Sequence, residues 1–334
     1  MSMNRSIFET TSFARRRLLL AAGLCALAPT RRAHAAREAW RLLCSGPAGS
    51  IPDLVARAVA EQLSPAAGPR TLVDNRPGAA GRLSIAALKA APADGATLLV
   101  AQGAIATVYP FLYDKPGYDV ATDLQPVSLA SEMVLALAVG PGVPAEVTSL
   151  EGFIDWLRRH PEAANLGSPG AGTLPHLLEA MLMGTARVPW QHVAYPGGPP
   201  AITALVGGQI AALVLPEGLL RAHHASGRIR VLATSGAVRA PSLPEVPTFA
   251  ERGHPELVIQ EWFAFFAPGR TPKEVVAAVS TELQDALARP AVAAAFAPAG
   301  MVAAGSSPAA LAARIASEQK TWQPVLRAHG IHAE

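Results

Sequence analysis

Short, largely apolar blocks alternate along the chain with longer stretches in which apolar residues recur every three or four positions. The short blocks predict strands, and they are Trp40–Cys44, Thr71–Val73, Thr97–Ala101, Val134–Val139, Asn165–Leu166, Ala211–Leu215, Val231–Thr234 and Trp262–Ala267. The longer stretches predict helices at Asp53–Leu63, Leu83–Ala91, Leu150–His160, Thr173–Met183, Pro272–Leu287 and Pro308–Leu326. Strands and helices in alternation predict an α/β fold with mainly parallel sheets.

Two of the predicted strands, Val134–Val139 and Trp262–Ala267, are far apart in the sequence and could each cross between two lobes. We therefore expect one lobe to comprise residues 36–137 and 263–334, and the other residues 138–262. Two crossing strands form a hinge, and the cleft between hinged lobes is a usual place for a ligand.

Residues 1–35 have the three-part pattern of a secretory signal peptide. Arg15–Arg17 precede the apolar stretch Leu18–Ala28, and the A-x-A sequence Ala33–Ala35 predicts a cleavage site. The paired arginines favour the twin-arginine export route, and ordinary Sec export is the alternative. An amphipathic first helix and lipidation at Cys25 are two further interpretations. The pattern predicts export to the periplasm.

The positive charge is concentrated in this N-terminal segment. Residues 1–35 carry six arginines and one acidic residue, so the rest of the chain holds 22 Lys and Arg against 24 Asp and Glu. Without a basic stripe, the rest of the chain is not expected to bind nucleic acid. Half of the residues are apolar and 16% are charged, which excludes a disordered chain. No uninterrupted apolar run reaches the roughly 18 residues of a membrane span.

The sequence shows no recognisable catalytic, cofactor or metal pattern. Cys44 ends an apolar block, which is typical of a buried side chain, and no His or Cys cluster has metal-ligand spacing. Gly140–Ala145 matches G-x-G-x-x-A, but the next predicted helix begins too far away for a dinucleotide site. Ser168 lacks the preceding glycine of a G-x-S-x-G elbow. We therefore expect no cofactor, no metal and no enzymatic activity.

Two loops rich in small residues, Ser45–Asp53 and Gly167–Thr173, each lie between a predicted strand and a predicted helix. The first turn of a helix presents free N–H groups and a partial positive charge, which favours anions. Neither loop contains Lys or Arg, so we expect backbone N–H groups at helix starts near Asp53 and Thr173 to hold an anion. An ordinary turn is the alternative for each loop.

Several segments match motifs of one protein family in the same order. They are Asn75–Gly81 (N-R-P-G-A-G-G in the family), Asp94–Leu99 (D-G-Y-T-L-L), Ser168–His176 (S-x-G-x-G-T-x-x-H), His192–Gly197 (H-V-P-Y-K-G), Leu243–Gly253 (L-P-D-V-P-T-x-x-E-x-G) and Ala267–Pro272 (A-P-A-G-T-P). Through them the chain resembles the Bug-type substrate-binding proteins of tripartite tricarboxylate transporters.

The resemblance implies a two-lobe periplasmic binding protein of type II, with an organic carboxylate in the cleft and membrane transporter subunits as partners. We expect it to be a monomer. The candidate ligand-binding residues, from the loops that match the family's gripping loops and from Tyr195, are Pro47, Ala48, Gly49, Ser50, Asp53, Ser168, Gly170, Gly172, Thr173 and Tyr195. Pro196 replaces a usual lysine and Ala211 a usual aspartate, so the surroundings of Tyr195 depart from the family pattern.

Two other functions are compatible with the sequence. A receptor of this kind could signal through a sensor-domain partner instead of feeding a transporter. An exported hydrolase is the other alternative, and it would require a Ser or Cys beside a His. The sequence leaves open whether the ligand is a dicarboxylate, an amino acid or an aromatic carboxylate.

The signal-peptide pattern predicts that the exported protein begins near Ala36. Mass spectrometry of the protein from a periplasmic fraction measures this directly. A periplasmic protein that still begins at Met1 would contradict the prediction.

Overall fold

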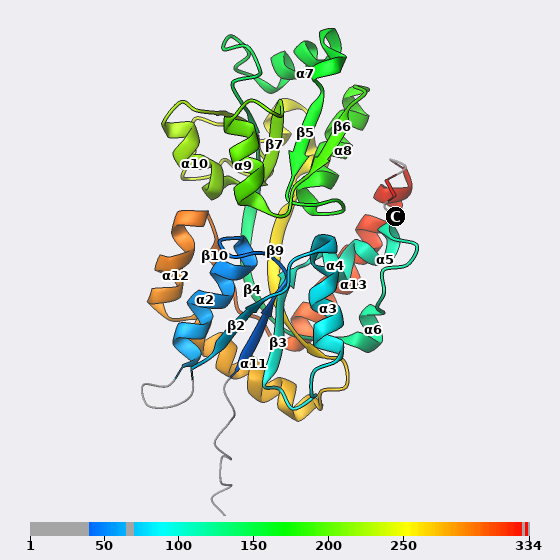
Figure 1. The fold of residues 1–334 in the computed structure, drawn as a ribbon, viewed down its shortest axis with the longest axis vertical. Coiled ribbons are helices and arrows are strands. Elements are labelled where there is room, and N and C mark those ends of the chain that lie inside the picture. The colour runs from blue at the N-terminus through cyan, green and yellow to red at the C-terminus, as the bar shows by residue number, and fades with distance from the viewer. Residues whose placement is uncertain (1–39, 65–69, 329–330, 333–334) are drawn as a thin grey trace, which may run out of the picture. The chain divides into compact units, whose positions relative to one another are not determined.

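The computed structural model describes residues 40–64, 70–328 and 331–332, so the predicted export segment 1–35 lies outside the described residues. This part of the chain contains a ten-stranded mixed sheet (Figure 1). The strands are β1 (Arg41–Cys44), β2 (Leu72–Asn75), β3 (Thr97–Gln102), β4 (Leu124–Val139), β5 (Asn165–Ser168), β6 (Gln191–Ala194), β7 (Ala212–Pro216), β8 (Arg230–Thr234), β9 (Gln260–Pro268) and β10 (Val302–Ala303).

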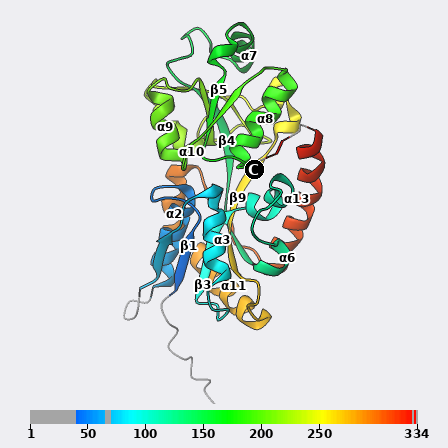
Figure 2. The same cartoon turned by 45° about the vertical axis from the view of Figure 1, so that its right-hand side comes forward.

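Helices lie between most of the strands. They are α2 (Ile51–Leu63), α3 (Arg82–Lys89), α4 (Ala104–Thr107), α5 (Tyr109–Leu112), α6 (Val120–Asp123), α7 (Leu150–Arg159), α8 (Leu174–Ala186), α9 (Gly198–Val206), α10 (Glu217–Ala225), α11 (Lys273–Leu287), α12 (Pro290–Phe296) and α13 (Pro308–Ala328). Helix α13 packs against β4 and α4 (Figure 2). No helix among the described residues is both long and apolar enough to cross a membrane.

The strand order is β2-β1-β3-β9-β4-β7-β5-β6, with β8 and β10 paired to β4. Strands β1, β2 and β3 are parallel to one another, and so are β5, β6 and β7. Every pairing of β4 and β9 is antiparallel, so the prediction of a mainly parallel sheet is wrong for the middle of the sheet. The cause is that the chain runs through the middle of the sheet in one direction as β4 and in the opposite direction as β9.

Strand β4 has 16 residues and joins the two parallel groups, whereas the sequence predicted only its last part, Val134–Val139. Its residues up to Val134 pair with β9, and Leu135–Val139 pair with β7. The part of β4 before Val134 was not predicted, because polar residues interrupt its apolar pattern. Two of them, Ser128 and Ser131, are buried where the register shifts, and the Ser128 hydroxyl accepts a bond from the Ser306 amide at 3.1 Å.

Helices α9 and α10 in the second parallel group, α12, which packs against α2, and the short helices α4, α5 and α6 were not predicted. Helix α9 begins with Gly198 and two prolines, which read as a loop. Proline is tolerated there because the first-turn N–H groups of a helix have no intrahelical partner. Helix α2 also starts earlier than the predicted Asp53, because its N-cap is Ser50.

Gly103 lies just before α4 and packs against β9, where only a residue without a Cβ atom fits. The Trp262 indole is fully buried over this glycine, and the Gly103 amide donates to the Trp262 carbonyl at 2.9 Å. A Cβ atom at Gly103 would lie 2.2–2.6 Å from three indole atoms. The indole Nε1 is held from its other side by the Glu318 carboxylate, at 2.9 Å, so it cannot move away without losing that bond.

We expect Gly103→Ala to lower the free energy of unfolding by about 2–3 kcal/mol, because the added methyl group overpacks the site against Trp262. Urea unfolding measures the change. Gly142→Ala is the matched control, since its Cβ would meet only the Gly208 carbonyl oxygen, at 3.5 Å. Equal stability of the two variants would contradict the packing described here.

Candidate ligand-binding cavity

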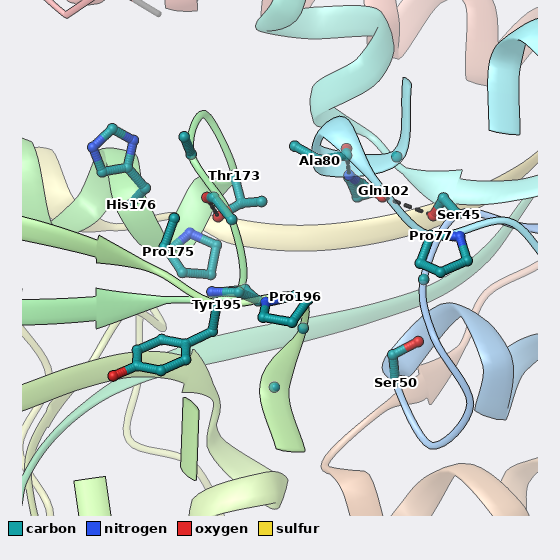
Figure 3. Close-up of a pocket in the computed structure, with 18 of the residues that line it drawn as sticks. Ser45, Ser50, Pro77, Ala80, Gln102, Thr173, Pro175, His176, Tyr195 and Pro196 are labelled. Atoms are coloured by element: carbon teal, nitrogen blue, oxygen red, sulfur yellow. Dashed lines mark hydrogen bonds between the residues drawn. The ribbon is translucent and has the colours of Figure 1, made fainter. Parts of the chain in front are cut away.

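A cavity of about 650 Å³ lies where the ends of the parallel strands meet β9. It is lined by Ser45, Gly46, Pro47, Ser50, Ile51, Pro52, Pro77, Gly78, Ala79, Ala80, Gly81, Arg82, Gln102, Tyr113, Pro169, Gly170, Ala171, Thr173, Pro175, His176, His192, Ala194, Tyr195, Pro196, Gly197, Gly198, Leu215, Pro216, Leu219, Glu261, Phe263 and His332. In Figure 3, Ser50 and Pro77 face the cavity from one side, and Thr173 and Pro175 from the other.

Two helix starts of the same construction face this cavity. Ser50 is the N-cap of α2 and Thr173 the N-cap of α8, and both have extended backbones. The Ser50 hydroxyl donates to the Pro47 carbonyl at 2.5 Å, and the Thr173 hydroxyl donates to the Gly170 carbonyl at 2.8 Å. Both hydroxyls therefore close the turn and do not cap their own helix.

A glycine precedes each cap residue in the left-handed region. The φ angles are +78° at Gly49 and +80° at Gly172, which favours a residue without Cβ. The Gly49 amide donates to the Asp53 carboxylate at 2.9 Å, and the Gly172 amide donates to His176 Nδ1 at 3.1 Å. In each turn, the side chain four residues after the glycine thus accepts the hydrogen bond of the glycine amide.

The first-turn amides of the two helices are left for a ligand. Each helix has proline as its second residue, which has no N–H group. The amides of Ile51 and Asp53 in α2, and of Leu174 and His176 in α8, donate to no group within the described ranges. The two turns therefore offer N–H donors with the partial positive charge of a helix N-terminus.

Asp53 is a structural anchor of the first turn. Its carboxylate also accepts from Arg57 Nε and from the Asn75 side-chain amide, each at 3.0 Å. Burial alone would raise the pKa of Asp53, but the bonds from Arg57, from the Gly49 amide and from Asn75 outweigh it and lower the pKa. The side chain stays ionised, and its negative charge is neutralised by Arg57.

A third loop, Pro77–Arg82, brings the only Lys or Arg side chain among the described residues that line the cavity. Arg82 lies over the Tyr113 ring, 3.8 Å from its centroid, and its Nε donates to the Ala79 carbonyl at 3.2 Å. The sequence singled out this loop only through the motif Asn75–Gly81. It missed Arg82, which follows the motif directly.

Gln102 holds the third loop in place. Its side-chain amide donates to the Ala80 carbonyl at 2.8 Å, and its oxygen accepts from the Ser45 hydroxyl at 2.9 Å (Figure 3). The Tyr109 hydroxyl also donates to the Ala80 carbonyl, at 2.9 Å. Ala80 has a φ of +53°, which is strained for a residue with a Cβ, and the two bonds stabilise that conformation.

Two histidines stack against each other beside the second turn. The ring centroids of His176 and His192 are 3.9 Å apart, and His192 Nε2 lies 2.7 Å from the Ser168 hydroxyl. Burial lowers the pKa of His192 to about 4, and burial together with the neighbouring His192 lowers the pKa of His176 to about 3. Both rings are therefore neutral at pH 7.

The Ser168–His192 contact is the Ser–His pair that the hydrolase alternative requires. Ser168, however, is fully buried, and its side chain is not part of the cavity wall. Its hydroxyl lies 3.0 Å from the Gly170 carbonyl oxygen and 2.7 Å from His192 Nε2, so both contacts tie it into the second turn. This pair supports the second turn and presents no nucleophile to the cavity.

Half of the predicted site residues line the cavity. These are Pro47, Ser50, Gly170, Thr173 and Tyr195. The others do not: Ala48, Gly49, Asp53, Ser168 and Gly172. Gly172 instead faces α5, where a Cβ would lie 2.3 Å from Leu112, and the neighbouring Ala171 carbonyl accepts a bond from the Tyr113 hydroxyl at 3.0 Å.

The neutral histidine pair predicts that the protein loses stability in mild acid. Their folded-state pKa values lie below the ordinary value of 6.5, so the unfolded chain binds more protons as the pH falls from 6.5 towards 4. Stability is therefore full above pH 6.5 and falls below it. Since both rings are partly exposed, we expect about 0.5–1 kcal/mol per histidine at pH 5.5, less than the full 1.4 kcal/mol per pH unit.

Urea unfolding at pH 7.5 and pH 5.5 tests this for the protein and for His192→Asn. The variant should lose less stability between the two pH values. His160→Asn, outside the cavity, serves as the control. An equal loss in all three proteins would show that the pair titrates normally.

The chain is similar to known proteins over most of its length. A family model described as tripartite tricarboxylate transporter family receptor (TctC) matches residues 55–331. Protein BugT of Bordetella pertussis (strain Tohama I) is 32% identical over 285 residues, which cover 85% of this chain and 87% of BugT. A protein from the tcbD-tcbE intergenic region of Pseudomonas sp. (strain P51) is 32% identical over 86% of this chain and 85% of its own length.

Solved structures share the fold. The periplasmic binding protein BugD superposes with a TM-score of 0.82 at 25% identity, over 89% of this chain and 99% of BugD. Rpa4515 of R. palustris, whose structure is described with adipate, has a TM-score of 0.82 at 28% identity, over 88% of this chain and 98% of its own. The predicted α/β fold of a two-lobe periplasmic binding protein is confirmed by this likeness. The chain belongs to the receptor family of tripartite tricarboxylate transporters, which includes the Bug-type binding proteins.

Proposed function

We propose that this protein is a periplasmic receptor that captures a small organic carboxylate in the cavity and delivers it to membrane transporter subunits. The observation that carries the proposal is the pair of matching turns at Ser50 and Thr173, which leave first-turn amides to a shared cavity. Family membership supports the role of a solute receptor and not of an enzyme.

The energetics of the two turns suit one carboxylate group. Each helix N-terminus contributes roughly 0.3–1 kcal/mol of charge–dipole attraction, and each hydrogen bond to an ionised group about 1.5–3 kcal/mol. Four or five such contacts support micromolar binding, about −8 kcal/mol, after the cost of association. Arg82 adds a cation at the edge of the same space.

The cavity has the size of a small-molecule site. Its volume of about 650 Å³ lies within the usual 300–1,000 Å³. The relative Rpa4515 is described with adipate, a six-carbon dicarboxylate, which supports a carboxylate of similar size here.

We also propose that the two parallel groups of strands are lobes that close on the ligand. The proposed lobes are residues 36–137 with 263–334, and residues 138–262. The change of β4 partners after Val134 supports a crossing near this boundary, and β9 provides the second crossing. The export signal in residues 1–35, by the twin-arginine or the Sec route, completes the proposal of a periplasmic receptor.

A thermal-shift screen of the mature protein against small carboxylates tests the function. A ligand at 100 times its dissociation constant adds about 2.7 kcal/mol to stability, which raises the melting temperature measurably. The panel should contain dicarboxylates, amino acids and aromatic carboxylates, with neutral amides of the same carbon chains as controls. Stabilisation by the amides alone, or by nothing in the panel, would contradict a carboxylate receptor.

We expect Arg82→Gln to weaken binding of the best carboxylate about tenfold to a hundredfold, because the ionised ligand loses a charged donor. Isothermal titration calorimetry measures the affinity. Arg76→Gln is the matched control, since Arg76 is exposed, pairs with Asp74 at 2.9 Å and does not line the cavity. An unchanged affinity in Arg82→Gln would place the ligand away from this side chain.

A further inference from the structure

We infer that Glu261 selects the ligand class: the cavity takes a carboxylate that also carries an ammonium group, and Glu261 binds that ammonium. This inference rests on the proposed function and deepens it, because it concerns the second polar group of the ligand. Neither the family match nor the described relatives assign a role to this side chain.

Glu261 lies in β9 and faces the cavity together with Phe263, two residues further along. The intervening Trp262 points the other way, where its indole binds Glu318. Only 4% of Glu261 is exposed. Its carboxyl makes no hydrogen bond and no ion pair within the part of the chain that the structure describes.

An unpaired buried carboxyl is unfavourable, since water is removed and no donor replaces it. The other buried glutamates have partners: Glu179 accepts from the Val214 amide at 3.1 Å, and Glu217 accepts from the Ser242 hydroxyl at 2.8 Å. Glu261 differs because its carboxyl has no such partner among the described residues and because it lines the cavity. A ligand is therefore the partner that can satisfy it.

The described residues around Glu261 do not supply a cation. The titratable groups that share the cavity are Arg82, Tyr113, His176, His192, Tyr195 and His332, and Tyr109 lies near enough for Glu261 to raise its pKa. Arg82 is engaged with the Tyr113 ring and the Ala79 carbonyl. Burial raises the pKa of Glu261 to about 8, so the free protein holds this carboxyl protonated at pH 7.

An ammonium group on the ligand would give the Glu261 carboxyl a partner. The positive charge stabilises the carboxylate form of Glu261, so the carboxyl gives its proton to the solvent when the ligand binds. An ion pair then forms in a site shielded from water. A second carboxylate at the same place would face a carboxyl that must stay protonated. Each charged end of the ligand then meets a protein group of the opposite charge. The carboxylate binds at the two turns and Arg82, and the ammonium binds Glu261.

Matched ligand pairs test the inference by calorimetry at pH 7. The pairs have equal carbon chains and differ in one end group: succinate and 4-aminobutanoate, glutarate and 5-aminopentanoate, adipate and 6-aminohexanoate. We expect an amino acid of the best-fitting length to bind at least tenfold more tightly than its dicarboxylate. Glu261→Gln should cancel or reverse that preference, whereas Glu274→Gln, an exposed residue outside the cavity, should keep it.

Proton release gives a second readout on the unaltered protein. Titrations in two buffers of different ionisation enthalpy should show close to one proton released per amino acid bound at pH 7, and none with Glu261→Gln. Tighter binding of the dicarboxylates, or binding of the amino acid without proton release, would overturn the inference while leaving a carboxylate receptor intact. Binding of neither series would instead count against the proposed function.

Discussion

The two left-handed glycines that precede the helix caps are the constraint on which the cavity depends. Gly49 and Gly172 turn the chain so that the next helix begins directly at the cavity wall. A side chain four residues further on then binds the glycine amide, and this bond fixes the turn. Because the glycine amide is consumed inside the turn, only the first-turn amides of the helix remain for a ligand.

The two turns solve this constraint with different chemistry. The first uses an ionised carboxylate, Asp53, whose charge is neutralised by Arg57 and which also accepts a hydrogen bond from Asn75. The second uses a neutral histidine, His176, which is kept uncharged by burial and by its contact with His192. An anion in the cavity therefore meets no uncompensated negative charge at either helix start. The antiparallel strands β4 and β9 bring the two turns to the same cavity. The first parallel group is joined to β9 through β3, and the second is joined to β4 through β7.

The sequence predicted most of the strands, about half of the α-helices and only part of the site. The spacing of apolar residues located β1, β3 and α8 to within a few residues, because these elements have simple one-face or buried patterns. The start of β4 was missed because its buried serines interrupt the apolar pattern, and Ser128 and the Leu129 amide bond with Ser306, far along the chain. Such long-range bonds leave no local signal.

Long-range contacts also explain why only part of the site was predicted. Glycine-rich loops before helices were visible, so the location of the two turns was predictable. Which residues face the ligand was not: Asp53 and Ser168 bind the turns internally. Arg82 at the start of α3, Gln102 at the end of β3 and Glu261 in β9 all line the cavity, and only the tertiary fold brings them together.

A crystal structure of the protein with its tightest-binding carboxylate would show whether both helix starts hold the ligand. We expect the carboxylate oxygens to lie within hydrogen-bond distance, about 2.7–3.2 Å, of first-turn amides at both Ser50-capped α2 and Thr173-capped α8, directly or through one ordered water. A carboxylate that contacts neither helix start, or only one of them, would contradict this expectation.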